Sequence, residues 1–255
     1  MNDTIIIEKK GVKLNKPILI EGLPGVGLVA KIAVDYLIKK SKAEKIAKIY
    51  SSYFPPQVNM TKKGVVKMPS MKIYKLKGKN NDFLILAGDI QPNDPEGQYK
   101  VNEEIIKYFK KKNGRFIITL GGYGTGNIKN DSSIYGAATS KKVVEKYSRF
   151  GIKFGETAGA IVGAAGLLIG IGKLHKIDGL CLMALTQGNY IDPKAAFNLL
   201  LKLLEIIEIK IDTQEMENKV AEGEKFIRKL EEMAQKELGR LEASSSKQKD
   251  LTYIR

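Results

Sequence analysis

Residues 17–30 read PILIEGLPGVGLVA and join a short apolar run, a glycine-rich turn and the start of a helical pattern. The run ends at Glu21, and apolar residues at helical spacing follow from Val26. A buried strand that leads through a tight turn into a helix is the opening half of a βαβ unit. This segment therefore predicts an α/β domain.

The same alternation of strand-like and helix-like segments continues along the chain. Runs of β-branched and other apolar residues predict buried strands at residues 17–21, 45–51, 83–87, 115–120 and 180–185. Apolar residues at helical spacing predict helices over residues 26–39, 96–112, 140–149, 160–174 and 193–208. We therefore expect a mostly parallel central sheet with helices on both faces. Alternating apolar residues between 53 and 76 also predict a hairpin, with residues 68–70 near its turn.

The composition divides the chain into three parts. Residues 1–210 carry the α/β pattern, and a single core of this size is common in α/β proteins. Residues 211–243 are rich in Glu and Lys, with apolar residues at heptad-like spacing. This pattern predicts a helical arm that either pairs with a partner helix or folds back on the core. Residues 244–255 begin with a stretch of Ser and Lys that is typical of a flexible linker, so they predict a flexible tail.

The composition also argues against several classes of protein. With Cys181 and His175 as its only cysteine and histidine, the chain cannot assemble a usual zinc site, and we expect no metal. Cys181 lies in an apolar run and is interpreted as a core thiol. We find no apolar stretch that could span a membrane and no secretory signal, so we expect a cytoplasmic protein. The net charge of +15 comes from scattered lysines without interleaved aromatic residues, which makes nucleic acid an unfavoured partner.

The glycine-rich turn partly matches two nucleotide-binding motifs, but it lacks residues that each motif requires. Gly25, Gly27 and Ala30 have the spacing of the dinucleotide fingerprint, but the next predicted strand ends at Ser51, where an acidic residue should bind the ribose. The lysine and hydroxyl residue of a phosphate loop are also missing directly after Gly27. We therefore expect no cofactor. The glycines are interpreted as residues that allow a tight turn and close packing of the helix on the strand.

Three polar or glycine-rich segments follow predicted strands and would meet at the carboxyl edge of the sheet, where open α/β sheets bind ligands. The candidate crevice residues are Gly22, Pro24, Gly25, Gly27, Gln91, Pro92, Gly122, Tyr123 and Gly124. Acid or base groups could come from Asp89, Asp94, Glu96 and Glu156, but the sequence shows no legible pair of nucleophile and base. We therefore predict a protein without catalytic activity. The alternative is a hydrolase or phosphorylase that binds a nucleoside or another small ligand in the crevice.

Four segments occur in a fixed order along the chain. They are residues 22–27 (GLPGVG), 89–92 (DIQP), 121–126 (GGYGTG), and the run 160–168 that leads to residues 180–182. Together they resemble the PAC2 family, the archaeal relatives of eukaryotic proteasome assembly chaperones, over about residues 16–209. The resemblance implies a three-layer sandwich similar to nucleoside phosphorylases but without their catalytic residues. It also implies homo-oligomers formed through the core and the helical arms.

The last five residues carry a further expectation from this resemblance. In the family and in proteasome activators, a tail ending in a hydrophobic residue, tyrosine and any residue inserts between α subunits of the 20S ring. The docking residues here would be Leu251, Thr252, Tyr253, Ile254 and Arg255, with the terminal carboxylate adding a charge-assisted contact. Tyr253 lies one position before the place that the family pattern gives to tyrosine. The resemblance therefore implies a proteasome assembly chaperone or adaptor, whose partners are proteasome α subunits and other copies of itself.

Overall fold

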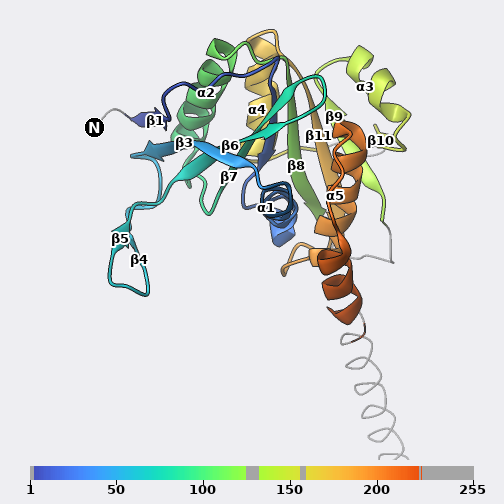
Figure 1. Cartoon of the computed structure of the whole chain (residues 1–255). Helices are drawn as coiled ribbons and strands as arrows, with labels where there is room; N and C mark the ends of the chain where they lie inside the picture. The colour runs from blue at the N-terminus through green and yellow to red at the C-terminus, as the bar shows by residue number, and fades with distance from the viewer. Residues whose placement is uncertain (1–2, 125–131, 156–158, 224, 226–255) are drawn as a thin grey trace, which may run out of the picture. The chain divides into compact units, whose positions relative to one another are not determined.

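Figure 1 shows the protein as a computed structural model, which describes residues 3–124, 132–155, 159–223 and 225. The chain divides into two compact units, residues 1–211 and residues 212–255. The elements of the first unit are β1 (Thr4–Glu8), β2 (Ile18–Gly22), η1 (Val26–Leu28), α1 (Val29–Ser41), β3 (Glu44–Ser51), β4 (Asn59–Met60), β5 (Val66–Lys67), β6 (Met71–Lys77), β7 (Asp82–Gly88), α2 (Pro95–Lys111), β8 (Phe116–Gly124), β9 (Ile134–Ala138), α3 (Lys141–Ser148), β10 (Lys153–Phe154), α4 (Ala164–Leu174), β11 (Asp178–Thr186) and α5 (Pro193–Ile207).

The first unit is built around a sheet with a parallel centre. Among the described residues this sheet has nine strands, in the order β1-β3-β6-β7-β2-β8-β11-β9-β10. The four central strands β7, β2, β8 and β11 are parallel neighbours. On one side β6, β3 and β1 follow in antiparallel pairs, and on the other side β9 is antiparallel to β11. The predicted α/β fold with a parallel sheet centre is confirmed.

The central strands are continuous apolar runs because helices cover both of their faces. Every residue of β7, which reads DFLILAG, is buried. Such runs are typical of parallel strands that are covered on both sides. In β6, by contrast, buried Met71 and Ile73 alternate with half-exposed Lys72 and Tyr74. This alternation is the pattern of a strand in which only one face packs on the core.

Two helices cover each face of the central sheet (Figure 1). Helices α2 and α4 pack together on one face, and α1 and α5 pack together on the other. Both α2 and α5 begin at a proline that follows a capping aspartate. The side chain of Asp94 accepts a hydrogen bond from the amide of Gly97, and that of Asp192 accepts one from the amide of Ala195. The order helix, sheet, helix is the predicted one.

The segment between β3 and β6 forms a hairpin, but its turn is not where the sequence places it. Strands β4 and β5 pair antiparallel, with Met60 opposite Val66. The turn lies between them, where Gly64 has a φ of 74° and its amide donates to the carbonyl of Thr61 at 2.9 Å. Residues 68–70 instead lead into β6, so the turn predicted there is wrong. Gly64 adopts the positive φ that this turn requires, which glycine does without steric cost.

Several boundaries also differ from the sequence-based expectations. Strand β8 extends through Gly124, so residues 121–124 of the glycine-rich segment 121–126 are part of this strand rather than of a loop after it. Residues 26–28 form a short 3-10 turn with Gly27 at a φ of 63°, and the regular helix begins at Val29. Helix α4 begins at Ala164, four residues later than predicted. The sequence does not indicate β9 or β10, because β9 reads IYGAA and β10 has only two residues.

The second unit begins with a helix over residues 214–223. The side chain of Asp212 accepts a hydrogen bond from the amide of Gln214 at 3.0 Å, and the carbonyl of Thr213 accepts one from the amide of Glu217 at 3.1 Å. The predicted docking residues 251–255 lie outside the described residues. In the part of the chain that is described, we find no helix long and apolar enough to cross a bilayer.

Candidate functional site

The carboxyl ends of the parallel strands meet at one edge of the sheet, where the sequence places the candidate crevice. Gln91 follows β7 and contacts two other segments of this edge. Its side-chain amide donates to the carbonyl of Pro24 at 2.6 Å, and its Oε1 accepts from the amide of Ala164 at 3.1 Å. Gln98 of α2 donates to the carbonyl of Pro92 at 2.7 Å. The structure therefore brings the loops after β2 and β7 together with the N-terminus of α4.

Three of the candidate glycines lie where protein atoms already occupy the space of a side chain. A Cβ on Gly22 would lie 2.2 Å from Cγ2 of Val34. A Cβ on Gly122 would lie 2.5 Å from the carbonyl oxygen of Val26, and one on Gly27 would lie 2.8 Å from a threonine hydroxyl of β11. These glycines allow backbone segments to approach each other closely. At these three positions the space that a side chain would take is therefore filled by other protein atoms.

The other candidates at this edge are more accessible. Gly25 and Gly124 are exposed, and Tyr123 is half-buried. The ring of Tyr123 lies 5.7 Å from that of Tyr135, at an interplanar angle of 35°. This side of the edge therefore presents aromatic and backbone surface, and the Nζ of Lys153 lies 5.6 Å from the centre of the Tyr135 ring.

Asp192 makes a contact at this edge that the sequence analysis missed. Its amide donates to the carbonyl of Gly27 at 2.9 Å, and its Oδ2 accepts from the hydroxyl of Thr186 at 2.8 Å. Its Oδ1 accepts from the amide of Ala195 at 2.9 Å and so caps α5. One residue thereby joins the turn after β2, the end of β11 and the start of α5. The signal for the cap, an aspartate before a proline and a helical run, is visible in the sequence.

A row of polar side chains crosses the buried centre of the sheet near this edge. Glu21 lies beside Thr119, and Thr119 lies beside Cys181, in the adjacent strands β2, β8 and β11. All three side chains are buried, and Glu21 is only 1% exposed. The hydroxyl of Thr119 donates to the carbonyl of Ala165 at 2.8 Å, so the row faces α4. This row cannot be recognised in the sequence because it arises from the pairing of strands that are far apart in the chain.

Burial controls the chemistry of the two ionisable groups in this row. It raises the pKa of Glu21 to about 8, against the opposing effect of hydrogen bonds with the backbone of Leu23 and Leu120. Oε1 of Glu21 accepts from the amide of Leu23 at 2.8 Å, whereas Oε2 has no hydrogen-bond partner among the described residues. Burial also raises the pKa of Cys181 to about 12. At neutral pH a protonated acid and a protonated thiol supply neither a general base nor a nucleophile.

The acidic candidates nearer the surface are engaged by other groups. Asp89 accepts from Lys31 at 2.8 Å, and this hydrogen bond lowers the pKa of Asp89. Asp94 caps α2, and Glu96 pairs with a lysine of α2 at 2.8 Å. Glu156 lies outside the described residues. No group of three or more His, Cys, Asp or Glu side chains that could hold a metal ion occurs in the described part of the chain.

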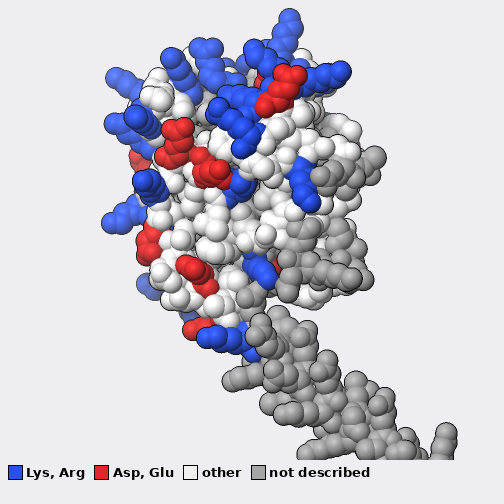
Figure 2. All heavy atoms as spheres, turned by 90° about the vertical axis from the view of Figure 1, so that its right-hand side faces the viewer, with Lys and Arg blue, Asp and Glu red and all other residues white. Residues whose placement is uncertain are grey.

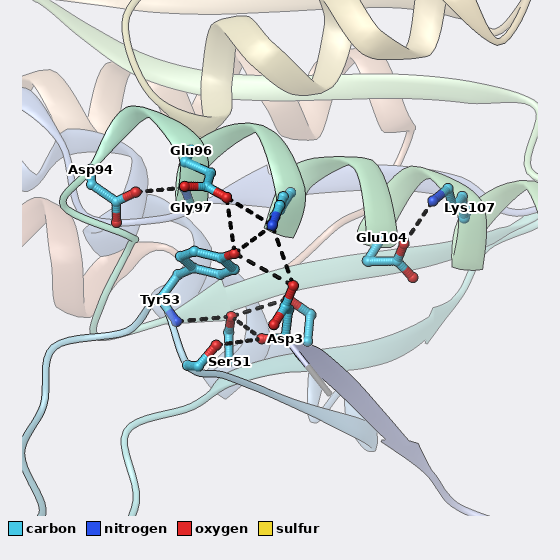
Figure 3. Close-up of polar contacts among 11 residues, drawn as sticks. Asp3, Ser51, Tyr53, Asp94, Glu96, Gly97, Glu104 and Lys107 are labelled. Carbon is cyan, nitrogen blue, oxygen red and sulfur yellow. Dashed lines mark hydrogen bonds and ion pairs between the residues drawn. The ribbon is translucent and has the colours of Figure 1, made fainter. Parts of the chain in front are cut away.

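A second cluster of polar contacts joins the N-terminal segment, the end of β3 and the start of α2 (Figure 3). Lys100 donates to the hydroxyl of Tyr53 at 2.7 Å and pairs with Oε1 of Glu96 at 2.8 Å. The hydrogen bonds with Glu96 and then Tyr53 raise the pKa of Lys100. The hydroxyl of Ser51 donates to the carbonyl of Asp3 at 2.7 Å. Because Tyr53 lies two residues after the end of β3, this cluster fixes the base of the segment that carries β4 and β5.

Charged side chains of both signs share the surface. Figure 2 shows Lys and Arg side chains crowded over the upper part of one face, with Asp and Glu side chains among them. The described surface also carries ion pairs, including Lys9 with Glu44 at 2.8 Å and Lys107 with Glu104 at 2.8 Å. The visible face is therefore not a continuous basic stripe of the kind that follows a nucleic-acid backbone.

Comparison with known proteins gives matches over nearly the whole chain. A model of the PAC2 family matches residues 19–231. The uncharacterized protein MJ1210 of Methanocaldococcus jannaschii is 35% identical over 241 residues, which cover 94% of this chain and 93% of that protein. The structure of Pyrococcus furiosus PbaB, described as an archaeal proteasome activator, matches with a TM-score of 0.84 and 34% identity, covering 91% of this chain and 100% of that chain. Pyrococcus furiosus PbaA, described as an archaeal homolog of proteasome-assembly chaperone, matches with a TM-score of 0.76 and 26% identity, covering 99% and 100%.

Proposed function

Because this chain belongs to the PAC2 family, we propose that it is a chaperone or adaptor of the proteasome that acts by binding other proteins. The observation that carries the proposal is the likeness, over nearly the whole chain, to a structure described as a proteasome activator. The likeness to a homologue of a proteasome-assembly chaperone supports the same class of function. The proposed partners are α subunits of the 20S proteasome and other copies of this chain, which would place the protein in the cytoplasm.

A binding role fits the chemistry of the carboxyl edge. Burial keeps Glu21 and Cys181 protonated at neutral pH, and Asp89 is neutralised by an ion pair. Protein atoms fill the side-chain space at Gly22 and Gly122. A hydrolase or phosphorylase would need a base beside an open crevice. None of the contacts that the described residues make at this edge favours that alternative.

We further propose that residues 251–255 dock on the proteasome α ring. Tyr253 combines a large apolar face and a polar tip with few rotatable bonds, which suits a pocket between two subunits. In a homo-oligomer each copy would contribute one such segment. Several segments that bind one ring raise the overall affinity without strong individual contacts.

Binding to purified α rings tests both parts of the proposal. The full-length protein, Tyr253→Ala and the matched control Thr252→Ala are passed over immobilised α rings. We expect Tyr253→Ala to weaken binding about tenfold or more, which corresponds to about 1.4 kcal/mol, and Thr252→Ala to bind like the wild type. A full-length protein that does not bind would refute the proteasome partner. Wild-type binding by Tyr253→Ala would refute only the docking segment.

A further inference from the structure

The hairpin between β3 and β6 carries exposed apolar side chains. Val58, Met60, Val65, Val66 and Met68 are between 53% and 78% exposed. We call residues 58–68 the ribbon. Met60 lies directly opposite Val66, so their side chains share one face of it. Because a two-stranded ribbon is only marginally stable in water and exposed apolar patches mark interaction sites, this face indicates a binding partner.

The ribbon lies in a strongly basic stretch of the chain. Residues 51–81 contain seven Lys and no Arg, Asp or Glu. Lys62, Lys63 and Lys67 are exposed and make no ion pair with other described residues. Lys62 and Lys63 lie in the turn beside the face of Met60 and Val66, and an apolar surface next to two such lysines is complementary to an acidic surface that also has apolar groups.

The composition of the ribbon favours a protein partner over a bilayer or a nucleic acid. Residues 55–73 contain no Trp, Tyr or Phe. Aromatic residues are enriched where proteins meet the membrane interface, and they provide the stacking surfaces for single-stranded nucleic acid. Two ribbons placed face to face would bring their lysines together, and like charges at an interface are unfavourable. An acidic surface is therefore a better match for the ribbon than a second ribbon is.

The helix that begins the second unit has the complementary charge. Residues 212–223 contain four carboxylates and one Lys, in a chain whose net charge is +15. Glu217 and Glu222 are exposed and make no ion pair with other described residues. Glu217 shares a helix face with Val220 and Ala221, which follow it by three and four positions. This helix therefore presents carboxylates beside small apolar side chains.

We propose that the ribbon of one copy binds the helix at residues 214–223 of a second copy. Lys62 and Lys63, at the turn of the ribbon, would lie beside Glu217 and Glu222, and Met60 and Val66 would cover Ala221 and the half-buried Val220. The contact joins two different surfaces, the ribbon of one copy and the helix of the next. It is therefore head to tail and can build a ring. The inference rests on the homo-oligomer of the proposed function and names the surfaces that form it.

Charge reversal on both surfaces tests this contact in the full-length protein. The variants are Lys62→Glu/Lys63→Glu on the ribbon and Glu217→Lys/Glu222→Lys on the helix. The control is Lys141→Glu/Lys142→Glu, an exposed pair in α3 with the same charge change as the ribbon variant. Molar mass is measured by sedimentation velocity over a range of protein concentrations. We expect each reversed variant alone to associate about tenfold more weakly or worse than the wild type. An equimolar mixture of the two should regain association, and the control should associate like the wild type.

A neutral variant tests the apolar half of the contact. Met60→Gln/Val66→Thr keeps the charge of the ribbon and removes apolar surface, so it should also weaken association severalfold. Circular dichroism and thermal melts confirm that each variant is folded.

If both charge-reversed variants associate as strongly as the wild type, the proposed contact is wrong. It is also wrong if the equimolar mixture of the two variants stays dissociated. Binding to α rings, measured on the same proteins, keeps this result separate from the proposed function. Tyr253→Ala could lose binding to α rings while Lys62→Glu/Lys63→Glu still forms the oligomer and binds the rings. That result would refute only the ribbon contact. A monomeric wild type would overturn the contact and the proposed homo-oligomer together.

Discussion

Replacing Glu21 with Gln tests whether a protonated carboxyl group lies in the core. Burial raises the pKa of Glu21 from 4.5 to about 8. The folded protein therefore keeps this proton up to about pH 8, whereas the unfolded chain loses it near pH 4.5. Between these values the unfolded state binds fewer protons, so the free energy of unfolding falls as the pH rises. Above about pH 8 both states are ionised and the decline ends.

The size of the effect follows from this difference in pKa. One such group changes the free energy of unfolding by about 1.4 kcal/mol per pH unit. The pH range between the two pKa values of Glu21 therefore corresponds to at most about 5 kcal/mol. Glu21→Gln keeps Oε1, which accepts from the amide of Leu23, and removes the titration. The variant should therefore be about as stable as the wild type near pH 5 and several kcal/mol more stable at about pH 9.

Guanidinium unfolding followed by circular dichroism, at several values between about pH 5 and about pH 9, measures this difference. Other titrating groups contribute equally to both proteins, so they cancel in the comparison. Glu145→Gln, at an exposed position of α3, is the control and should follow the wild type throughout. If the difference between wild type and Glu21→Gln does not change across this range, the carboxyl group does not hold its proton in the folded core.

Three further predictions concern the same edge of the sheet and its core. Gly122→Ala should lower the free energy of unfolding by about 2 kcal/mol, because its Cβ would lie 2.5 Å from the carbonyl oxygen of Val26. Gly25→Ala, whose Cβ would meet no atom within 4 Å, is the control for denaturant unfolding, and equal losses in both variants would contradict the packing role. Cys181 should react with a thiol reagent only after unfolding, because burial raises its pKa to about 12, and rapid labelling of the native protein would disprove an inert thiol. Nucleosides, nucleotides and phosphate should leave the melting temperature unchanged. A reproducible increase would instead support a hydrolase or phosphorylase that binds a small ligand.

The strands that helices cover on both faces could be predicted closely from the sequence. Residues 83–87 were expected as a strand, and β7 spans Asp82–Gly88, because an apolar run of this length is itself the signal of burial. Strand β9 has no such signal. Its sequence, IYGAA, has low strand propensity, and its pairing with β11 depends on a contact with a distant part of the chain.

The candidate site could be predicted less completely. Gln91 and the glycines of the carboxyl edge lie at or shortly after the ends of strands, so the rule that parallel strands end at one edge was enough to group them. The row of Glu21, Thr119 and Cys181 required the strand order, which one sequence does not provide. The local feature in the sequence that points to this row is Glu21, a glutamate near the end of an apolar strand. The hairpin turn was predicted near residues 68–70, but Gly64 provides the positive φ at the turn.

The place of β2 in the sheet has a consequence for how this chain folds. Ile18 pairs with Phe83 on one side and with Phe116 on the other, and both partners are distant in the chain. During synthesis β2 leaves the ribosome long before either neighbour, so its backbone hydrogen-bonding groups stay unpaired until β7 and β8 arrive. Pairing over such distances slows folding and exposes strand edges to other chains. A protein proposed to assist the assembly of others thus passes through a vulnerable stage of its own.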